Sequence, residues 1–188
     1  LKKPLKTVPI FLRCNRTGNG MKSLGMLWLI KKVELGDASR LRQIRLALVK
    51  ENPKTFGILY DTERRKPVKY FENEIKRYLV PDAAIFFLEV NGEIVGMAKV
   101  GRYGKKDPYT GYLSSMGLMK KYHGRGFGER LLKYRLDWIR KNTGFKKVLM
   151  TVVDGNEKMT YLAYKMGFKE ISHGSFYGVP NTKLELKV

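Results

Sequence analysis

The chain is poor in the residues that build metal centres and disulfide frameworks. It contains one cysteine, Cys14, and two histidines, His123 and His173, among 188 residues. A single cysteine forms no internal disulfide, and two isolated histidines do not make the usual zinc site. We therefore expect neither a disulfide-stabilised fold nor a bound metal, and we assign no metal ligand.

Long apolar runs are also missing. The longest, residues 24–30, is interrupted by Gly25 and is much shorter than a bilayer span requires. No small-residue cleavage pattern follows it, as a signal peptide would need. We expect a cytoplasmic protein with no membrane partner.

Acidic residues are scarce relative to basic ones. The 17 Asp and Glu face 38 Lys and Arg, which gives a formal net charge of +21. An excess of this size indicates a polyanionic ligand, an acidic substrate, affinity for nucleic acid or simply a solvated basic surface.

The hydrophobic content is that of a folded domain. It reaches 43%, with only 7 prolines, which argues against disorder, and the length suits one domain with a substantial core. The first twenty residues show no periodicity. We expect residues 1–25 to be an N-terminal leader, tag-derived or disordered, and residues 26–188 to form the single domain.

One stretch, residues 114–139, changes character in its middle. It begins apolar and strand-like and ends as an amphipathic helix, with a turn between them that carries Gly124, Gly126 and Gly128. Glycine lets a ligand approach the backbone, and the start of a helix offers unpaired N–H groups to an anion. The turn is surrounded by four basic residues, Lys120, Lys121, Arg125 and Arg130. The stretch therefore predicts a site for a ligand that carries phosphate.

Common phosphate-binding templates do not fit this turn. A dinucleotide fingerprint requires glycine where Glu129 stands, and a Walker A loop requires Lys and Ser or Thr after its last glycine. Residues 125–128 match the start of an RNA-recognition octamer, but that octamer continues as a strand, and here a helix follows.

The stretch resembles the acetyl-CoA-binding motif of the GCN5-related N-acetyltransferases (GNAT), Arg/Gln-x-x-Gly-x-Gly/Ala between a strand and a long helix. Residues 123–128 place the two motif glycines on Gly126 and Gly128, with His123 at the opening position. Residues 156–168 are similar to the family's asparagine-containing helix that ends in Gly-Phe. Together the two elements are more specific than either alone, and the resemblance extends over residues 26–188.

The resemblance implies acetyl-CoA as the co-substrate. Its pantetheine arm would lie between two separating strands and pair with their backbone, and an N–H near Leu118 would polarise the thioester carbonyl. The Asn156 side chain would reach the same arm. The residues implied to bind the cofactor are Met116, Gly117, Leu118, His123, Gly124, Arg125, Gly126, Phe127, Gly128, Glu129, Arg130 and Asn156.

The family's usual general acid is absent from its usual position. In many members a tyrosine four residues before the Gly-Phe pair protonates the departing thiolate, but here that position is Ala163. Tyr164 and Tyr161 are the candidate replacements. No base is assigned; three carboxylates are considered as groups acting through water, Asp154, Glu89 and Glu93.

Two aromatic residues follow the first predicted helix. Phe56 and Tyr60 lie near a stretch, residues 52–57, that resembles the loop lining the acceptor pocket in many GNAT enzymes. They are candidate substrate-binding residues, with ordinary packing as the alternative role.

Periodicity and turn residues predict the order β-α-α-β-β-β-α-β-α-β-β. The strands are expected over residues 26–33, 84–90, 93–100, 111–119, 147–153, 168–172 and 182–188, and the helices over 38–52, 67–80, 127–142 and 156–167. This order is that of an α/β (α+β) GNAT fold. It has a mixed sheet of about six to seven strands flanked by about four helices, splayed between the fourth and fifth strands.

The sequence thus predicts an N-acetyltransferase that moves an acetyl group from acetyl-CoA to a small-molecule or peptide amine by direct attack in a ternary complex. A catalytically silent acyl-CoA-binding sensor is an alternative, because of Ala163. A nucleic-acid-binding module is a further alternative, because of the charge. The closing strands allow a homodimer.

Overall fold

The computed structural model describes residues 10–11, 26–56, 59–104, 107–176 and 178–188. The described strands are β1 (Ile10–Phe11), β2 (Leu27–Lys32), β3 (Ala84–Val90), β4 (Glu93–Arg102), β5 (Thr110–Leu118), β6 (Lys147–Val153), β7 (Lys169–Phe176) and β8 (Val179–Lys187). The α-helices are α1 (Ala38–Glu51), α2 (Pro53–Phe56), α3 (Tyr60–Arg64), α4 (Val68–Tyr78), α5 (Phe127–Asn142) and α6 (Glu157–Lys165). Single 3₁₀ turns span Leu35–Asp37 and Lys120–Tyr122.

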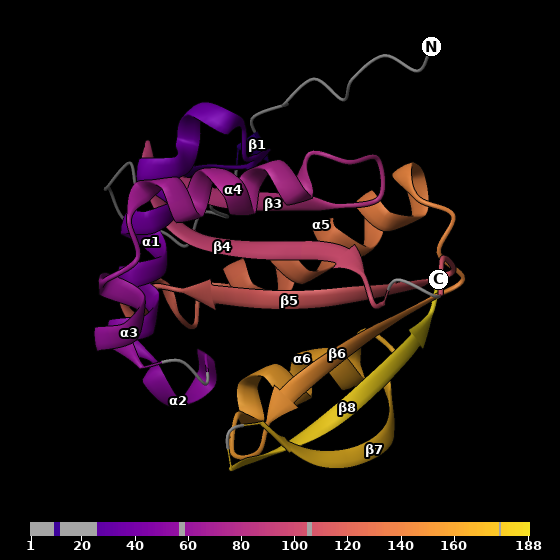
Figure 1. The fold of residues 1–188 in the computed structure, drawn as a ribbon. Coiled ribbons are helices and arrows are strands. Elements are labelled where there is room, and N and C mark those ends of the chain that lie inside the picture. The colour runs from indigo at the N-terminus through magenta and orange to yellow at the C-terminus, as the bar shows by residue number, and fades with distance from the viewer. Residues whose placement is uncertain (1–9, 12–25, 57–58, 105–106, 177) are drawn as a thin grey trace, which may run out of the picture.

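The strands form one sheet in the order β1-β2-β3-β4-β5-β6-β8-β7 (Figure 1). Within this described sheet, β5 and β6 are parallel, and every other neighbouring pair is antiparallel. The chain crosses from β5 to β6 through α5, as a parallel connection requires.

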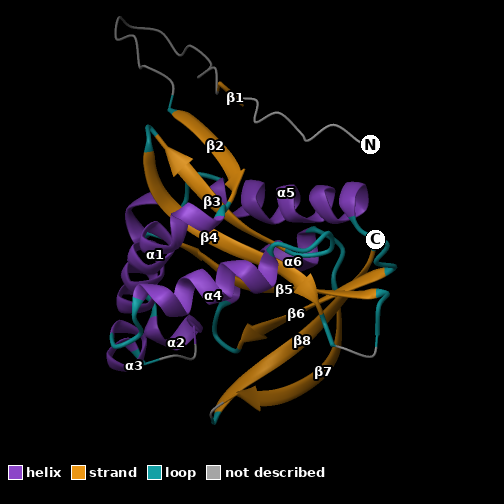
Figure 2. Cartoon of the chain, turned by 45° about the horizontal axis from the view of Figure 1, so that its top comes forward, coloured by secondary structure: helices purple, strands orange, loops and turns teal. Residues whose placement is uncertain are grey.

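Helices cover both faces of the sheet (Figures 1 and 2). Strand alternation directs Phe86 to the face covered by α5 and Phe87 to the face covered by α1 and α4, and both are fully buried. The side chains of α5 that fill the first core include Phe127, Leu131 and Leu136. The sheet therefore separates two apolar cores. A site that opens through the sheet can be lined by helices from both faces.

The hairpin between β3 and β4 joins two strands that the sequence predicted, through a turn at Asn91 and Gly92. Asn91 and Gly92 both have positive φ, 51° and 81°, as a two-residue turn of this kind needs. The predicted limits of β6 and the start of α5 are also those observed.

The predicted α/β fold with a mixed sheet is confirmed; α4 and α6 are shorter than predicted, and the other main differences are additions. The sheet has eight strands because β1 pairs with β2. The short helices α2 and α3 occupy a stretch for which the sequence predicted no helix, and β7 and β8 are longer than predicted. Most of residues 1–25 lies outside the described residues, so the predicted leader stays a prediction.

Candidate active site

The strands β5 and β6 separate part of the way along their length. Their parallel ladder pairs Thr110 with Lys147 and ends where Leu113 pairs with Met150. Beyond that rung, residues 114–118 of β5 and 151–153 of β6 no longer pair with each other. The predicted splay between the fourth and fifth strands, counting β2 as the first, is therefore present.

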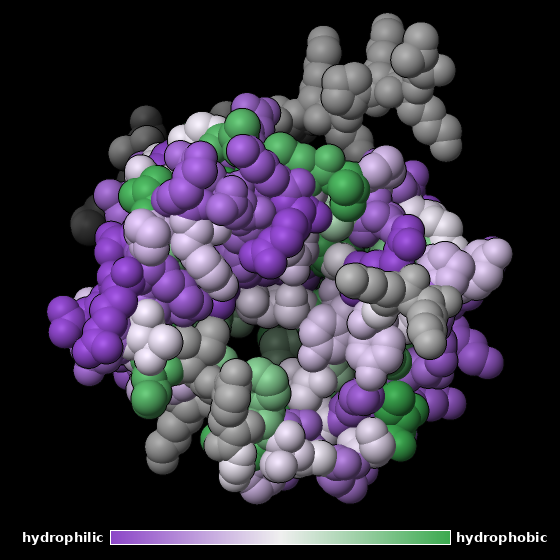
Figure 3. Space-filling view, in the orientation of Figure 1, coloured by the Kyte–Doolittle hydropathy of each residue, from purple (hydrophilic) through white to green (hydrophobic). Residues whose placement is uncertain are grey.

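A cavity of about 1300 Å³ opens at this gap. Figure 3 shows the molecule hollowed near the middle of the face on which β5 and β6 part in Figure 1. The wall is formed by residues of the helices α1 to α6 and of the strands β5, β6, β7 and β8. The volume is larger than a drug-sized ligand requires, so it leaves room for the arm of a larger ligand.

A bulge in β5 shapes the opening. Ser114 pairs with Lys99 and Gly117 with Met97, so β5 carries one residue more than β4 over this interval. Ser115, within the bulge, has a positive φ of 49°. A bulge bends its strand and increases the local twist. It turns the end of β5 away from β6, and Ser114, Ser115 and Met116 all line the cavity.

The backbone of Leu118 faces the gap. The N–H of Met119 donates to the Val95 carbonyl on β4 at 2.9 Å. Because neighbouring residues of an extended chain direct their N–H groups to opposite sides, the Leu118 N–H points away from β4. An extended ligand lying between the strands would meet this donor.

The glycine turn has the backbone conformation that its glycines permit. Gly124 and Gly126 have φ of 73° and 76°, and Gly126 is the N-cap of α5. The first α5 hydrogen bond runs from the Arg130 N–H to the Gly126 carbonyl, 3.1 Å. The N–H groups at the preceding positions of the helix start are therefore left for another acceptor.

The basic residues around this turn differ in how far they are neutralised. Lys121 forms an ion pair with Glu93 at 2.9 Å. Arg125 lies over the Tyr122 ring and Arg130 over the Trp28 ring, at 5.7 and 5.1 Å from the centroids. Stacking on a ring orients a guanidinium and leaves its charge available to an anion.

His123 replaces the arginine or glutamine that opens the family motif. Its Nε2 lies 2.9 Å from the Leu118 carbonyl oxygen, so a proton on Nε2 is donated to the end of β5. The imidazole thus fixes the turn to the strand that borders the cavity.

Of the sequence-predicted residues, three line the cavity: Met116, Phe56 and Asn156. Phe56 ends α2 and packs under Gly117, where an added Cβ would lie 2.6 Å from its ring. Tyr60 begins α3 and does not line the cavity within the described residues. The glycine turn lies outside the cavity wall, at the start of α5.

Asn156 caps α6 at the edge of the cavity. Its side-chain oxygen accepts the Met159 N–H at 3.3 Å, which is the usual hydrogen bond of an N-cap asparagine. Its amide nitrogen has no equivalent role in the cap and is the group available to a ligand.

Substitution of Asn156 separates these two roles. Asn156→Ala removes the cap and should lower the free energy of unfolding by about 1 kcal/mol. Asn156→Asp keeps the capping oxygen and removes the amide donors, so stability should be retained while the Kd for acetyl-CoA rises several-fold. Urea unfolding and calorimetric titration of both variants measure the two effects. An Asp variant with unchanged affinity would limit Asn156 to capping.

Tyr161 and Tyr164 lie on the outer face of α6. They are 66% and 48% exposed, and neither lines the cavity within the described residues. The Tyr164 hydroxyl is 3.4 Å from Glu170. The residue at the family's tyrosine position, Ala163, is fully buried in the core. The structure therefore brings neither predicted general acid to the opening between the strands.

The three carboxylates considered as bases all have partners elsewhere. Glu89 pairs with Lys31 and Arg40, at 2.7 and 3.0 Å. Glu93 accepts from Lys121 and Tyr122, and Asp154 from Thr182. None is among the described residues that line the cavity.

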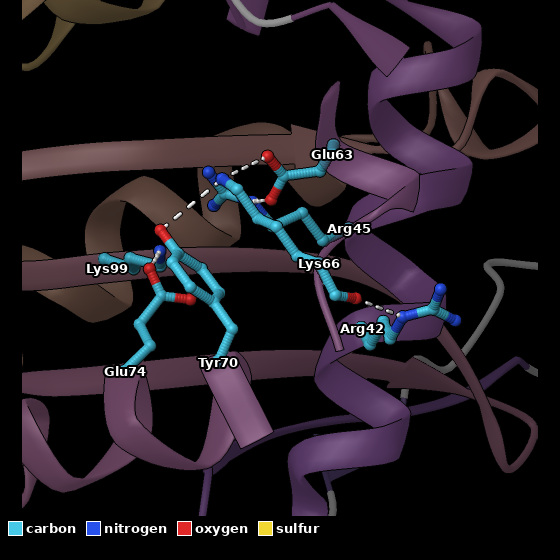
Figure 4. A network of polar contacts seen from close by, with 7 residues as sticks. All are labelled: Arg42, Arg45, Glu63, Lys66, Tyr70, Glu74 and Lys99. Atoms are coloured by element: carbon cyan, nitrogen blue, oxygen red, sulfur yellow. Dashed lines mark hydrogen bonds and ion pairs between the residues drawn. The ribbon is translucent and has the colours of Figure 1, made fainter. Parts of the chain in front are cut away.

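A buried polar network beside the cavity was not predicted. Figure 4 shows Arg45 of α1, Glu63 of α3 and Lys66 close together, with Glu74 of α4 and Lys99 of β4 next to them. The Glu63 carboxylate is fully buried and lies 2.6 Å from Arg45 Nε and 2.7 Å from Lys66 Nζ.

The pKa values in this network follow from burial and from the ion pairs. Burial lowers the pKa of the Lys99 ammonium to about 8, with the positive charge of Arg45 adding to the effect and Glu74 opposing it. Burial alone would raise the pKa of Glu63, but the hydrogen bond from Lys66 and the charge of Arg45 hold it below its usual range.

Two buried arginines also line the cavity without having been predicted. Arg45 is 6% exposed and Arg135 is 1% exposed. A pattern in the sequence marks both, because each occupies the apolar face of its helix. Arg45 lies four residues after the buried Leu41, and Arg135 lies four residues after the buried Leu131.

The described residues contain no group of three or more His, Cys, Asp or Glu side chains placed to hold a metal ion. Among the described helices, none has the length and apolar composition needed to cross a membrane.

The fold and the glycine turn correspond to a known family. The model of the "Acetyltransferase (GNAT) family" matches residues 45–168, which spans the strands around the splay, the turn and α6. The chain belongs to this family, and the family assignment made from the sequence is confirmed.

Individual relatives agree with this assignment. The chain is 31% identical over 80 residues to the N-alpha-acetyltransferase RimI of Mycobacterium tuberculosis, a match covering 43% of this chain and about half, 48%, of that protein. It is 26% identical over 155 residues to an N-alpha-acetyltransferase of Sulfurisphaera tokodaii, covering 78% of this chain and 83% of the relative. The structure of yncA, a putative acetyltransferase from Salmonella typhimurium with its cofactor acetyl-CoA, aligns with a TM-score of 0.70 at 18% identity. That alignment covers 85% of this chain and 93% of the other.

Proposed function

We propose that the protein is an N-acetyltransferase that transfers the acetyl group of acetyl-CoA to the primary amine of a small molecule or a peptide. The opening between β5 and β6 beside the glycine turn carries this proposal. The turn presents N–H groups and basic side chains to a pyrophosphate, and the gap presents strand edges to an extended arm. The family and the names of both relatives support it.

In the proposed mechanism, acetyl-CoA lies between the strands and the amine enters from the cavity. The neutral amine attacks the thioester carbonyl carbon, a C–N bond forms, and the C–S bond breaks. The Leu118 N–H would stabilise the negative charge that develops on the carbonyl oxygen. The amine loses a proton to water, and the departing thiolate gains one. Holding both reactants in line supplies much of the rate.

The thiolate needs a proton donor, and Tyr112 is the tyrosine of β5 that lines the cavity. Its hydroxyl donates to Thr151 Oγ1 of β6 at 2.9 Å, across the end of the parallel ladder. This hydroxyl pair stands where the strands begin to part. The sequence-based candidates, Tyr164 and Tyr161, remain alternatives for the same role.

A matched Tyr→Phe series distinguishes these candidates. Tyr112→Phe should lower kcat about 100-fold or more, within the range general acids contribute. Tyr161→Phe and Tyr164→Phe should leave kcat within twofold of wild type, because their hydroxyls lie outside the cavity. Steady-state rates of thiol release with saturating acetyl-CoA measure all three. The reverse pattern would indicate that Tyr161 or Tyr164 of α6 is the general acid.

The function itself is tested by titrating the protein with acetyl-CoA and then following thiol release against a panel of amines. Binding that depends on the glycine turn, together with release that depends on an amine, is the expected result. Absence of acetyl-CoA binding to the wild-type protein would refute the proposal. Sedimentation of the same sample tests the predicted homodimer.

A sensor that binds acyl-CoA without turnover is the second candidate. The observation that favours it is the buried Ala163 at the position of the family's usual tyrosine. It predicts full acetyl-CoA affinity and no thiol release with any amine. A nucleic-acid-binding module would instead show affinity that falls steeply with salt and does not respond to coenzyme A.

A further inference from the structure

The described residues that line the cavity carry positive charge and include no acidic side chain. Among the described residues that line it, the cationic ones are Arg45, Lys66, Arg135 and Lys183. None is Asp or Glu. These cations come from different elements around the cavity, so their fields converge on its interior.

On the α1 side, two of the cations share one carboxylate. Glu63 bridges Arg45 and Lys66 from behind the wall, so one positive charge of this group is not balanced by it (Figure 4). Arg45 Nη1 is buried and has no hydrogen-bond partner among the described residues. Arg45 therefore adds positive charge to the cavity wall while its Nε is fixed by Glu63, and its buried Nη1 is left without a described partner.

On the α5 side, Arg135 is buried without a described carboxylate partner. Its guanidinium contacts the Lys99 carbonyl oxygen at 3.4 Å and Met116 Sδ at 2.9 Å. Its Nε has no partner within the described part of the chain. Burial lowers the pKa of the guanidinium to about 9, so it is still charged at neutral pH. An unpaired buried cation is costly, and an anion in the cavity would offset that cost.

On the β8 side, Lys183 is held by an aromatic residue. Its Nζ donates to the Tyr103 hydroxyl at 3.0 Å and lies 5.4 Å from the centre of that ring. The hydrogen bond with Tyr103 raises the pKa of Lys183, which keeps the ammonium charged. The lysine is thus oriented at the wall without losing its charge.

We propose that the acceptor amine also carries a carboxylate or phosphate group, and that Arg45 and Lys183 bind this group while Arg135 adds to the field. This inference rests on the proposed acetyl transfer and specifies its substrate class. The wall opposes a polyamine, because each additional ammonium would enter a cavity that already holds unbalanced positive charge. An acidic amino acid or a peptide with acidic residues near its N-terminus has the required chemistry.

The phosphates of coenzyme A are the other possible anions. Their proposed site is the glycine turn, which contributes no side chain to the cavity wall among the described residues. Substitutions of Arg45 and Lys183 should therefore change the KM for the acceptor and leave the Kd for acetyl-CoA unchanged.

The first experiment uses the wild-type protein and pairs of acceptors that differ in charge alone. Thiol release is measured with glutamate against glutamine, and with peptides whose second residue is Glu, Gln or Lys. The acidic member of each pair should have a kcat/KM at least tenfold higher, and the preference should shrink as salt is added. A phosphorylated amine paired with its unphosphorylated form distinguishes phosphate from carboxylate recognition.

The second experiment changes the wall. Lys183→Gln should raise KM for the acidic acceptor about fivefold and leave the neutral acceptor unchanged, and Lys183→Glu should reverse the preference toward the Lys peptide. Lys187→Gln is the control, because Lys187 is exposed on the same strand and does not line the cavity. If the Arg45→Met variant folds, it is compared with Lys50→Gln, a control on the same helix α1. If Arg45→Met does not fold, the Lys183 variants alone test the proposal.

The outcomes separate the two levels of the proposal. Equal rates for acidic and neutral acceptors would overturn the inference and leave acetyl transfer standing. If a Lys183 variant loses affinity for acetyl-CoA, this part of the wall binds the cofactor, and the inference about acidic acceptors is also overturned. No thiol release with any amine would refute the transferase function itself.

Discussion

Gly126→Asp should weaken acetyl-CoA binding at least 100-fold, about 2.7 kcal/mol. Gly126 has φ 76° and caps α5, so its Cα stands where the helix start would receive a pyrophosphate. A carboxylate placed there repels the phosphates at short range, an effect of a few kcal/mol near a protein surface. Calorimetric titration at moderate salt measures it.

Two matched variants isolate the charge. Asn and Asp both tolerate positive φ, so Gly126→Asn reproduces the shape without the charge and should cost about tenfold. Gly92→Asp adds the same residue at a glycine with φ 81° and open space around it, in the β3–β4 turn. It should leave the Kd unchanged. Equal affinity for Asp and Asn at position 126 would show that no phosphate approaches the turn.

Glu63→Gln should lower the free energy of unfolding by about 3 kcal/mol, the cost of breaking a buried ion pair. Its carboxylate is fully buried and is the shared partner of Arg45 and Lys66. Without it, two neighbouring cations repel each other beside the cavity. Urea unfolding measures the loss. Glu72→Gln is the control, because its ion pair with Lys69 is on the surface and should contribute little.

The acid dependence of this loss has a defined sign. The pKa of Glu63 is below its ordinary value of 4.5 in the folded protein. Its contribution to stability is therefore complete above pH 4.5 and disappears as the pH falls through the lower folded pKa. The difference between wild type and Glu63→Gln should be constant from pH 7 to 5 and shrink in stronger acid. The double variant Arg45→Met/Glu63→Leu should recover most of the stability, because well-packed apolar residues replace buried ion pairs at little cost.

The architecture could be predicted because its signals are local. The β-branched and apolar run of β6, the Asn91-Gly92 turn and the helical spacing of the apolar residues in α5 each specify one element without tertiary information. The two glycine-containing motifs then indicated the family, and with it the separation of β5 from β6. In each of these elements the local preference of the sequence agrees with the tertiary contacts.

The details of the site depend on contacts that periodicity does not encode. The helices α2 and α3 are 4 and 5 residues long, too short to show an apolar repeat. Glu63 is the shared partner of Arg45 and Lys66, and it reaches Arg45, which is 18 residues earlier in the chain, only after α3 folds back against α1. The direction of Tyr164 follows from helix geometry, since one residue of offset from Ala163 turns a side chain by about 100°. The one-residue offset is visible in the sequence alone, but the sequence did not show whether α6 would rotate to bring Tyr164 to the position that Ala163 occupies.

The short parallel ladder between β5 and β6 has a consequence for the lifetime of the protein. In the described sheet, β5 and β6 pair over four residues, from Thr110 to Leu113 of β5. Beyond them, the facing backbone edges of β5 and β6 are not paired with each other. Open edges are where chains pair with one another and aggregate. A cofactor that fills the gap would cover those edges and raise stability in proportion to its concentration relative to Kd. On the proposed function, the supply of acetyl-CoA would then govern how long each copy of the protein lasts as well as how fast it works.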